Sequence, residues 1–181
     1  MQIDRSAYDP PSEGDEAYFD AGQPRSFDAT LLEAPASVLQ ARRARILGRE
    51  DSVTAAVRAM QKEHSGVVLI TEDGTDASRV IGVFTERDVL FRIMDGGRNP
   101  ATVPLEQVMT SEPECLTEDG TVADVLRMMS VGGFRHVPIV DSRRRPVGVV
   151  SVRDVVDLLV EAFPAEIVNR GGDRQTEREG G

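Results

Sequence analysis

Two short stretches of this chain follow one pattern and decide its fold. Residues 82–88 read GVFTERD, and residues 148–154 read GVVSVRD. In each stretch a β-rich run ends in a hydroxyl residue, and an aspartate follows three positions later; the pairs are Thr85 with Asp88 and Ser151 with Asp154. This spacing is typical of a capped helix start. Because it occurs twice, each time with a glycine three residues before the hydroxyl, it favours paired ligand sites in addition to a cap.

The repetition extends beyond this motif. Residues 50–60 match residues 119–129 at a spacing of 69, and residues 80–90 match residues 146–156 at a spacing of 66. The difference of three places an insertion in the first copy's hairpin, where loops tolerate insertion. An internal repeat of this kind indicates one structural unit used twice.

Each copy is predicted to contain a lead-in strand, a helix, two strands and a second helix. Ser52 and Thr121 precede apolar residues at helical spacing and are predicted N-caps. The predicted strands are 44–47, 67–71 and 79–84 in the first copy, and 114–117, 136–140 and 146–150 in the second. We expect an α/β fold of two β-α-β-β-α repeats, which pack together with pseudo-two-fold symmetry because neither buries much core alone.

Composition divides the chain further. Residues 1–36 hold eight acidic and two basic residues and are expected to form a mobile acidic arm. The first repeat is assigned to residues 37–97, a linker to 98–112, the second repeat to 113–164 and a mobile polar tail to 165–181.

The pooled charge and the cysteine count exclude several classes of function. A formal charge of -10 over 181 residues disfavours nucleic acid or an anionic membrane as partner. The single cysteine, Cys115, excludes an intrachain disulfide and a multi-cysteine zinc site. Without a secretory signal or a run of about 18 to 20 apolar residues, the chain is expected to be soluble and cytoplasmic.

The paired motifs, the Val108-Met109-Thr110 segment and the strand Phe134–Asp141 together resemble a tandem of cystathionine β-synthase (CBS) domains, as in a stand-alone Bateman module. The resemblance covers about residues 38–163. In that family the hydroxyl residue and the aspartate of each motif hold the phosphate and ribose of an adenosine ligand. The resemblance therefore implies one cleft with Thr85 and Asp88 and another with Ser151 and Asp154; Arg153, between these two, is included in the candidate site.

Arg135 and His136 are further candidates, because a guanidinium beside an imidazole at the start of a strand can pair with phosphate oxygens. Pro138, on the same strand, is included in the candidate site. Alternating strand directions offer another interpretation, in which one of the two basic side chains faces solvent and the other the core. Gly66 and Val67 hold the matching positions in the first copy, so we expect two unequal clefts, one of them without this cationic pair.

The resemblance also implies that Leu116 and Thr117 line the adenine pocket, whereas the residues alone favour core packing. His64, His136 and Cys115 fit no metal-ligand spacing, and no catalytic nucleophile motif is present. The run Arg143–Arg145 is interpreted as a solvated hairpin tip.

We therefore expect a regulatory sensor without catalysis and without a required cofactor, which binds AMP, ATP or NAD(H), with S-adenosylmethionine as a further candidate. The resemblance implies a homodimer formed through helices, and an unidentified protein target is a further expected partner. An inosine monophosphate dehydrogenase, which carries a similar tandem, needs a barrel of about 250 residues that this length does not hold. The remaining alternative is a protein-interaction adaptor with vestigial clefts.

Overall fold

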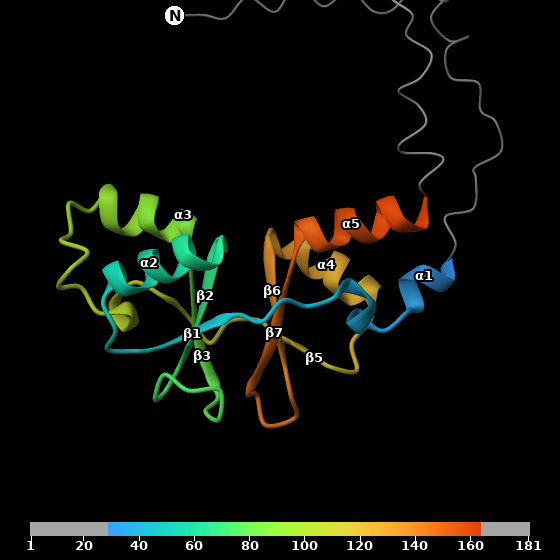
Figure 1. Ribbon diagram of the computed structural model, residues 1–181, viewed down its shortest axis with the longest axis horizontal. Coiled ribbons are helices and arrows are strands. Elements are labelled where there is room, and N and C mark those ends of the chain that lie inside the picture. Colours follow the sequence, from blue (N-terminus) through green and yellow to red (C-terminus); the bar gives the residue numbers. More distant parts are fainter. Residues whose placement is uncertain (1–28, 164–181) are drawn as a thin grey trace, which may run out of the picture.

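Two small sheets, each with helices packed beside it, lie next to each other in the computed structural model, which describes residues 29–163 (Figure 1). The first half contains β1 (Arg45–Gly48), α2 (Val53–Glu63), β2 (Val67–Thr71), β3 (Val80–Thr85), α3 (Glu86–Asp88) and η3 (Val89–Met94). The second half contains β5 (Leu116–Thr117), α4 (Val122–Gly132), β6 (His136–Val140), β7 (Pro146–Ser151) and α5 (Val152–Ala162). The predicted β-α-β-β-α order is confirmed in both halves. The predicted tail at 165–181 and most of the predicted arm lie outside the described residues.

The helices that follow the lead-in strands begin at the predicted caps. The Ser52 hydroxyl accepts the Ala55 N–H at 3.2 Å. At the start of α4, Asp124 Oδ2 accepts the Thr121 N–H at 3.1 Å, and the Thr121 hydroxyl accepts the Asp124 N–H at 3.2 Å. This reciprocal capping box satisfies two backbone donors that a bare helix start would leave unpaired. The second helix of the first half departs from expectation, because η3 is a π-helix.

Strand pairing is the same in both sheets. The lead-in strand runs parallel to the middle strand, and the middle strand pairs antiparallel with the last one. The first residue of each middle strand therefore lies opposite the hydroxyl residue of the motif, Val67 opposite Thr85 and His136 opposite Ser151.

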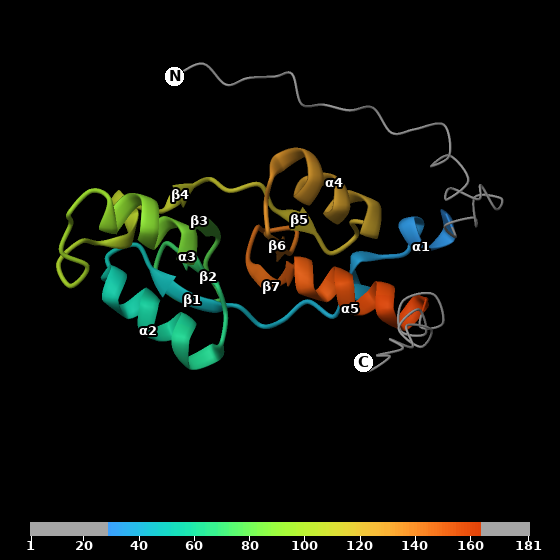
Figure 2. The same ribbon diagram turned by 90° about the horizontal axis from the view of Figure 1, so that it is seen from above.

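The segment that leads into each half pairs with the last strand of the other half. Arg42, which precedes β1, forms two backbone hydrogen bonds with Val149 of β7, at 3.0 and 2.9 Å. In the predicted linker, β4 (Thr110–Ser111) precedes β5 and extends the first sheet at β3, after η4 (Leu105–Gln107) has packed its Leu105 into the first core. The chain thus passes between the halves twice (Figure 2). These two reciprocal pairings tie the sheets together.

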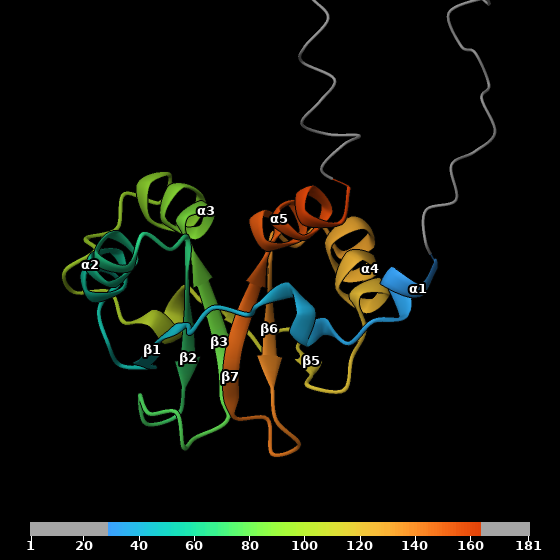
Figure 3. The same cartoon turned by 45° about the vertical axis from the view of Figure 1, so that its right-hand side comes forward.

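Three groups of buried side chains form the core. One fills each half, and a third lies between the sheets, where β3 and β7 are close together (Figure 3). This third group consists of Val67, Leu69, Val80, Val140 and Val149. Within residues 29–163, no helix is long and apolar enough to span a bilayer.

Residues 29–36, which the sequence assigns to the acidic arm, are part of the folded structure. They contain α1 (Ala29–Glu33) and the start of η2 (Ala36–Leu39). Ala36 and Leu39 are buried in the core of the second half, although they precede the first half in sequence. Their short apolar pattern gave no helical or strand period, so the sequence did not reveal this packing.

Candidate functional site

The glycine of each motif lies where a segment that connects the two halves passes over the strand. These exchanged segments are residues 41–42, beside Gly148, and residues 109–111, beside Gly82. A Cβ at Gly82 would overlap Met109 Sδ, and a Cβ at Gly148 would lie 3.0 Å from the Arg42 carbonyl oxygen. A side chain at Gly148 would push the backbone of its exchanged segment away from the strand, whereas one at Gly82 would displace the side chain of Met109. The repeated glycine is therefore explained by close approach rather than by a turn.

The aspartate of each motif caps its helix. Asp88 Oδ2 accepts the Thr85 N–H at 2.8 Å and the Thr85 hydroxyl at 2.7 Å. Asp154 Oδ2 accepts the same two groups of Ser151 at 2.7 and 2.6 Å. Both aspartates are among the few buried charged residues in the described chain. The cap predicted from the sequence is present at both motifs.

The second oxygen of each aspartate faces an arginine. Asp88 Oδ1 lies 3.1 Å from Nε of Arg92, and Asp154 Oδ1 lies 2.9 Å from Nε of Arg42. Each Oδ1 has two lone pairs, so it can accept a further hydrogen bond from a ligand hydroxyl. The aspartates can therefore cap the helix and contact a ligand at the same time.

A cavity of about 450 Å³, here called the first cleft, lies between the two halves around the first motif. Its lining comprises Val83, Thr85, Arg87, Asp88, Arg92, Thr110, Glu112, Pro113, Glu114, Gly132, Gly133, Phe134, Arg135, His136 and Pro138. The first half thus supplies the hydroxyl and the carboxylate, the second half supplies the Arg135–His136 pair, and the segment around β4 supplies a wall between them.

A smaller cavity of about 190 Å³, the second cleft, surrounds the second motif. Its lining comprises Arg42, Arg43, Ala44, Arg45, Glu63, His64, Ser65, Gly66, Val67, His136, Val149, Ser151, Arg153 and Asp154. Most of these positions match those of the first cleft at the repeat spacings of 69 and 66. The two clefts are therefore equivalent in construction and unequal in size.

Of the cationic pair, Arg135 lies in the cleft of the other repeat's motif, and His136 lies in both clefts. The sequence places Arg135 and His136 beside the motif of the second copy, but they line the first cleft, together with Thr85. The reason is that each cleft takes its motif from one half and the start of the middle strand from the other half. The second cleft has cations of its own in the lead-in segment, Arg42 and Arg43 among them, and His136 lines both cavities.

Leu116 and Thr117 line neither cleft. Leu116 pairs with Ile139 and packs against the core of the second half, and Thr117 is exposed and hydrogen-bonded to Asp119. The neighbouring Pro113 and Glu114 line the first cleft instead. Leu116 therefore packs in the core, as the residues alone indicate.

The environment of His136 sets its charge. Burial is the main cause that lowers the pKa of this imidazole, and the Arg135 cation lowers it further. Glu86 and Asp154 act in the opposite direction. His136 is therefore mainly neutral near pH 7, and an anion bound beside it would raise its pKa again.

Arg92 is a cleft residue that the sequence analysis missed. Its guanidinium donates to the Val108 carbonyl at 2.6 Å and to the Thr110 hydroxyl at 3.0 Å, in addition to the ion pair with Asp88. Its position four residues after Asp88 was the available signal, since such pairs meet on a helix. In residues 29–163 no group of His, Cys, Asp or Glu side chains could hold a metal ion.

Comparison with known proteins agrees with this architecture. The chain is 35% identical over 128 residues to an uncharacterised 17.7 kDa protein of Acidianus ambivalens, covering 67% of this chain and 75% of that one. A CBS domain protein of Pyrobaculum aerophilum, PAE2072, solved in complex with AMP, superposes with a TM-score of 0.62 at 24% identity over 72% of this chain and 99% of that one.

The CBS domain pair of protein MJ0100, solved with 5′-methylthioadenosine and S-adenosylmethionine, superposes with a TM-score of 0.60 at 22% identity, covering 70% of this chain and 99% of that one. Likenesses at these identities show the fold. The CBS domain family model matches residues 41–95 and again residues 105–161. The chain therefore belongs to the CBS domain family and carries two of these domains as a pair.

Proposed function

We propose that this chain is a regulatory module that binds one adenine-containing nucleotide in the first cleft and catalyses no reaction. The observation that carries the proposal is the meeting of buried Asp88 with the Arg135–His136 pair in one cavity. A carboxylate that can accept from a ribose diol and a cation that can pair with a phosphate then line the same space.

The apolar part of the lining suits a nucleobase. Val83, Phe134 and Pro138 line the first cleft, and these side chains offer flat or branched surface without competing polar atoms. A volume of about 450 Å³ lies within the range of roughly 300 to 1,000 Å³ that small-molecule sites occupy. The second cleft, at about 190 Å³, falls below that range, although cavities of about 360 and 590 Å³ share Asp154 and Arg43–Arg45, respectively, with it. We propose that one nucleotide binds per chain, in the first cleft, because this cleft combines a sufficient volume with a motif and the cationic pair.

AMP, ATP and NAD(H) are the proposed ligands, with S-adenosylmethionine as a further candidate. The two structural relatives described above were solved with adenosine compounds, which supports the ligand class. Because the first cleft is built from both halves, its ligand would favour the arrangement of halves that fits it best. Only such a difference in affinity between arrangements can transmit a signal.

The test is a thermal-shift panel with AMP, ADP, ATP, NAD, NADH and S-adenosylmethionine, on protein freed of copurified nucleotide. A ligand at 100 times its Kd stabilises by about 2.7 kcal/mol, which is roughly 5 to 10 °C for a chain of this size. Asp88→Ala is expected to abolish the shift. Asp124→Ala is the matched control, since it removes a capping box of the same kind that lines neither cleft.

Three results would decide against the proposal. Absence of a shift with every compound at millimolar concentration would favour the alternative, a protein-interaction adaptor with vestigial clefts. A shift that survives Asp88→Ala and is lost in Asp154→Ala would move the binding site to the second cleft. Calorimetric titration then counts the molecules bound, and two equal sites per chain would contradict the size argument.

We further propose that two chains pair through one helical face. Leu90, Phe91 and Met94 of η3 are 62%, 67% and 69% exposed, and Val152 and Val156 of α5 are also exposed. The helices that carry them run along the same side of the molecule (Figure 1). An apolar face that the repeat presents twice suits a second copy related by a two-fold axis.

Sedimentation of the protein over a range of concentrations tests this pairing. Phe91→Glu places a charge in the centre of the face and is expected to give a monomer. Val147→Glu is the control, because Val147 is a comparably apolar exposed residue at the hairpin end of β7. A wild-type monomer at every concentration, or a dimer that survives Phe91→Glu, would contradict the pairing.

A further inference from the structure

The hairpin between β6 and β7 does more than turn the chain. Asp141 Oδ1 accepts the N–H groups of Arg143 and Arg145, at 2.9 and 2.8 Å, and so fixes the loop. Arg144, between them, has a φ of 64°, a left-handed conformation that is uncommon for any residue except glycine. Its carbonyl accepts the Val80 N–H at 2.9 Å. Arg144 is therefore docked on the first residue of β3, whereas Arg143 and Arg145 are exposed, as expected for a solvated tip.

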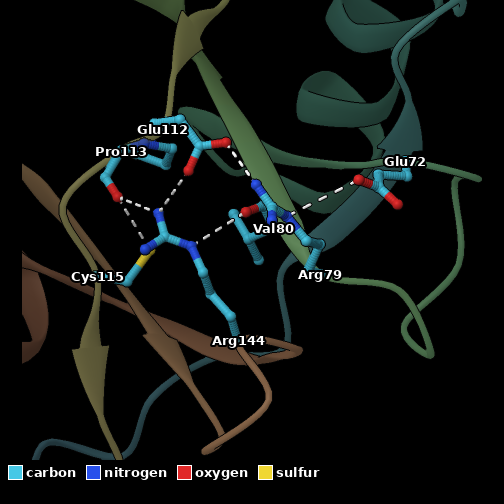
Figure 4. Close-up of polar contacts among 7 residues, drawn as sticks. All are labelled: Glu72, Arg79, Val80, Glu112, Pro113, Cys115 and Arg144. Atoms are coloured by element: carbon cyan, nitrogen blue, oxygen red, sulfur yellow. Dashed lines mark hydrogen bonds and ion pairs between the residues drawn. The ribbon is translucent and has the colours of Figure 1, made fainter.

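The Arg144 side chain continues this contact across the junction of the two halves (Figure 4). Its Nη2 donates to the Pro113 carbonyl at 2.9 Å and lies 3.6 Å from Glu112 Oε2, and its Nε donates to the Val80 carbonyl at 3.4 Å. The other Glu112 oxygen, Oε1, lies 2.7 Å from Nη2 of Arg79. Glu112 is thus held between an arginine of each half.

These contacts end at a wall of the first cleft. Glu112, Pro113 and Glu114 line that cavity, and Arg144 does not. Glu112 itself has a φ of 45°, so this part of the wall has a backbone conformation that needs neighbours to hold it. Its N–H donates to the Ile81 carbonyl at 2.9 Å, and its side chain has the two arginines.

We propose that Arg144 is a positioning residue for the first cleft: it holds the Glu112–Glu114 wall at the distance from Thr85 and Asp88 that a nucleotide requires. The proposal rests on the proposed function only for the identity of the ligand. Its physical basis is the planar guanidinium, which presents several donors in fixed directions and so contacts Val80, Pro113 and Glu112 together. A lysine at this position has a single flexible ammonium that cannot keep all three contacts.

The experiment compares wild-type protein with Arg144→Ala, Arg144→Lys and Arg143→Ala. Arg143 is the matched control because it is the adjacent, exposed arginine of the same loop, and its hydrogen bond to Asp141 is donated by its backbone N–H. Hydrogen exchange of the Glu112 amide is measured in each ligand-free protein. The Kd for AMP is then measured by calorimetry at a temperature where thermal melts show all four proteins folded.

We expect faster exchange at Glu112 in Arg144→Ala, and AMP binding weaker by about 5- to 10-fold, with Arg144→Lys between this variant and wild type. Arg143→Ala should match wild type in both measurements. A lower melting temperature with an unchanged Kd and unchanged exchange would show that Arg144 stabilises the fold without positioning the wall, and would overturn the proposal.

Failure of the proposed function gives a different result. If wild-type protein binds none of the nucleotides, the ligand assignment is wrong, and exchange at Glu112 still decides whether Arg144 holds the wall. Unchanged exchange in Arg144→Ala would overturn the positioning role in that case as well.

Discussion

Arg42 and Asp154, which are 112 residues apart in sequence, form an ion pair with 2.9 Å between Nε and Oδ1. The Asp154 side chain is only 5% exposed, whereas that of Arg42 is 59% exposed. In the first half the matching aspartate, Asp88, pairs with Arg92 one helical turn away. The motif aspartate thus pairs with an arginine of its own helix in the first half, and with an arginine of the exchanged segment in the second half. The second motif therefore depends on contacts between the halves.

Replacing Arg42 should therefore cost stability. In Arg42→Ala the largely buried Asp154 loses its charged partner, and we expect the free energy of unfolding to fall by about 1 kcal/mol, since the exposure of Arg42 reduces the full value of such a bond. Urea unfolding measures this. Arg43→Ala is the control, because its side chain is 89% exposed. Equal losses in the two variants would show that the pair with Asp154 contributes nothing specific.

Gly148→Ala should loosen the exchanged segment. Its Cβ would lie 3.0 Å from the Arg42 carbonyl oxygen and 3.1 Å from Ala41 Cβ, so the backbone of that segment must move. We expect a loss of about 1 to 3 kcal/mol, as for other overpacked sites. Exchange of the Arg42 and Val149 amides, which bond each other's carbonyls, should become faster. Val147→Ala, at an exposed position of the same strand, should leave both amides protected.

Sequence periodicity was sufficient for most elements within each repeat, the π-helix η3 being the exception. The strands 67–71 and 136–140 were predicted with the bounds that the structure has, because continuous apolar runs between polar loops leave little choice. The N-caps at Ser52 and Thr121 were also confirmed, since a hydroxyl residue before an apolar helical period is a local signal.

Pairings between distant segments were beyond such signals. Nothing local indicates that Arg42 bonds Val149, or that residues 29–39 pack on the second half, because both depend on where the chain crosses. For the same reason, local signals did not indicate that the motif of one half shares a cleft with the start of the middle strand of the other half. Arg144 was missed because three arginines at a hairpin tip have the composition of a solvated turn, and its left-handed backbone is not evident from its residue type.

Cys115 should react slowly with alkylating reagents in the folded protein. Burial is the main cause that raises the pKa of this thiol, Glu112 raises it further and Arg144 opposes them. A raised pKa leaves less thiolate, which is the reactive form, at any given pH. We expect the rate of modification by iodoacetamide at pH 8 to be at least about tenfold lower in native protein than in urea. Because Cys115 is the single cysteine, the total incorporation reports it directly, and equal native and unfolded rates would contradict this environment.

His136 should make both stability and nucleotide binding depend on pH. Burial and Arg135 lower the pKa of His136 in the folded protein, whereas its pKa in the unfolded chain is about 6.5. Below that pH the unfolded chain binds a proton that the folded protein resists. The contribution of His136 to stability is therefore present above about pH 6.5 and is lost as the pH falls through the lowered folded value. His136→Gln should flatten this part of the profile, while His64→Gln should leave it in place.

A phosphate in the first cleft should reverse the effect, because a nearby anion favours the imidazolium that burial and Arg135 disfavour. Binding of AMP near pH 7 is then expected to take up a fraction of a proton, with affinity rising as the pH falls toward 6. Calorimetry in two buffers with different ionisation enthalpies measures this uptake. AMP has a phosphate that titrates in the same range, so His136→Gln supplies the reference in which only the ligand titrates. Equal proton uptake in wild type and His136→Gln would show that the phosphate does not lie beside His136, and would place it nearer Arg87 or Arg92 in the same cleft.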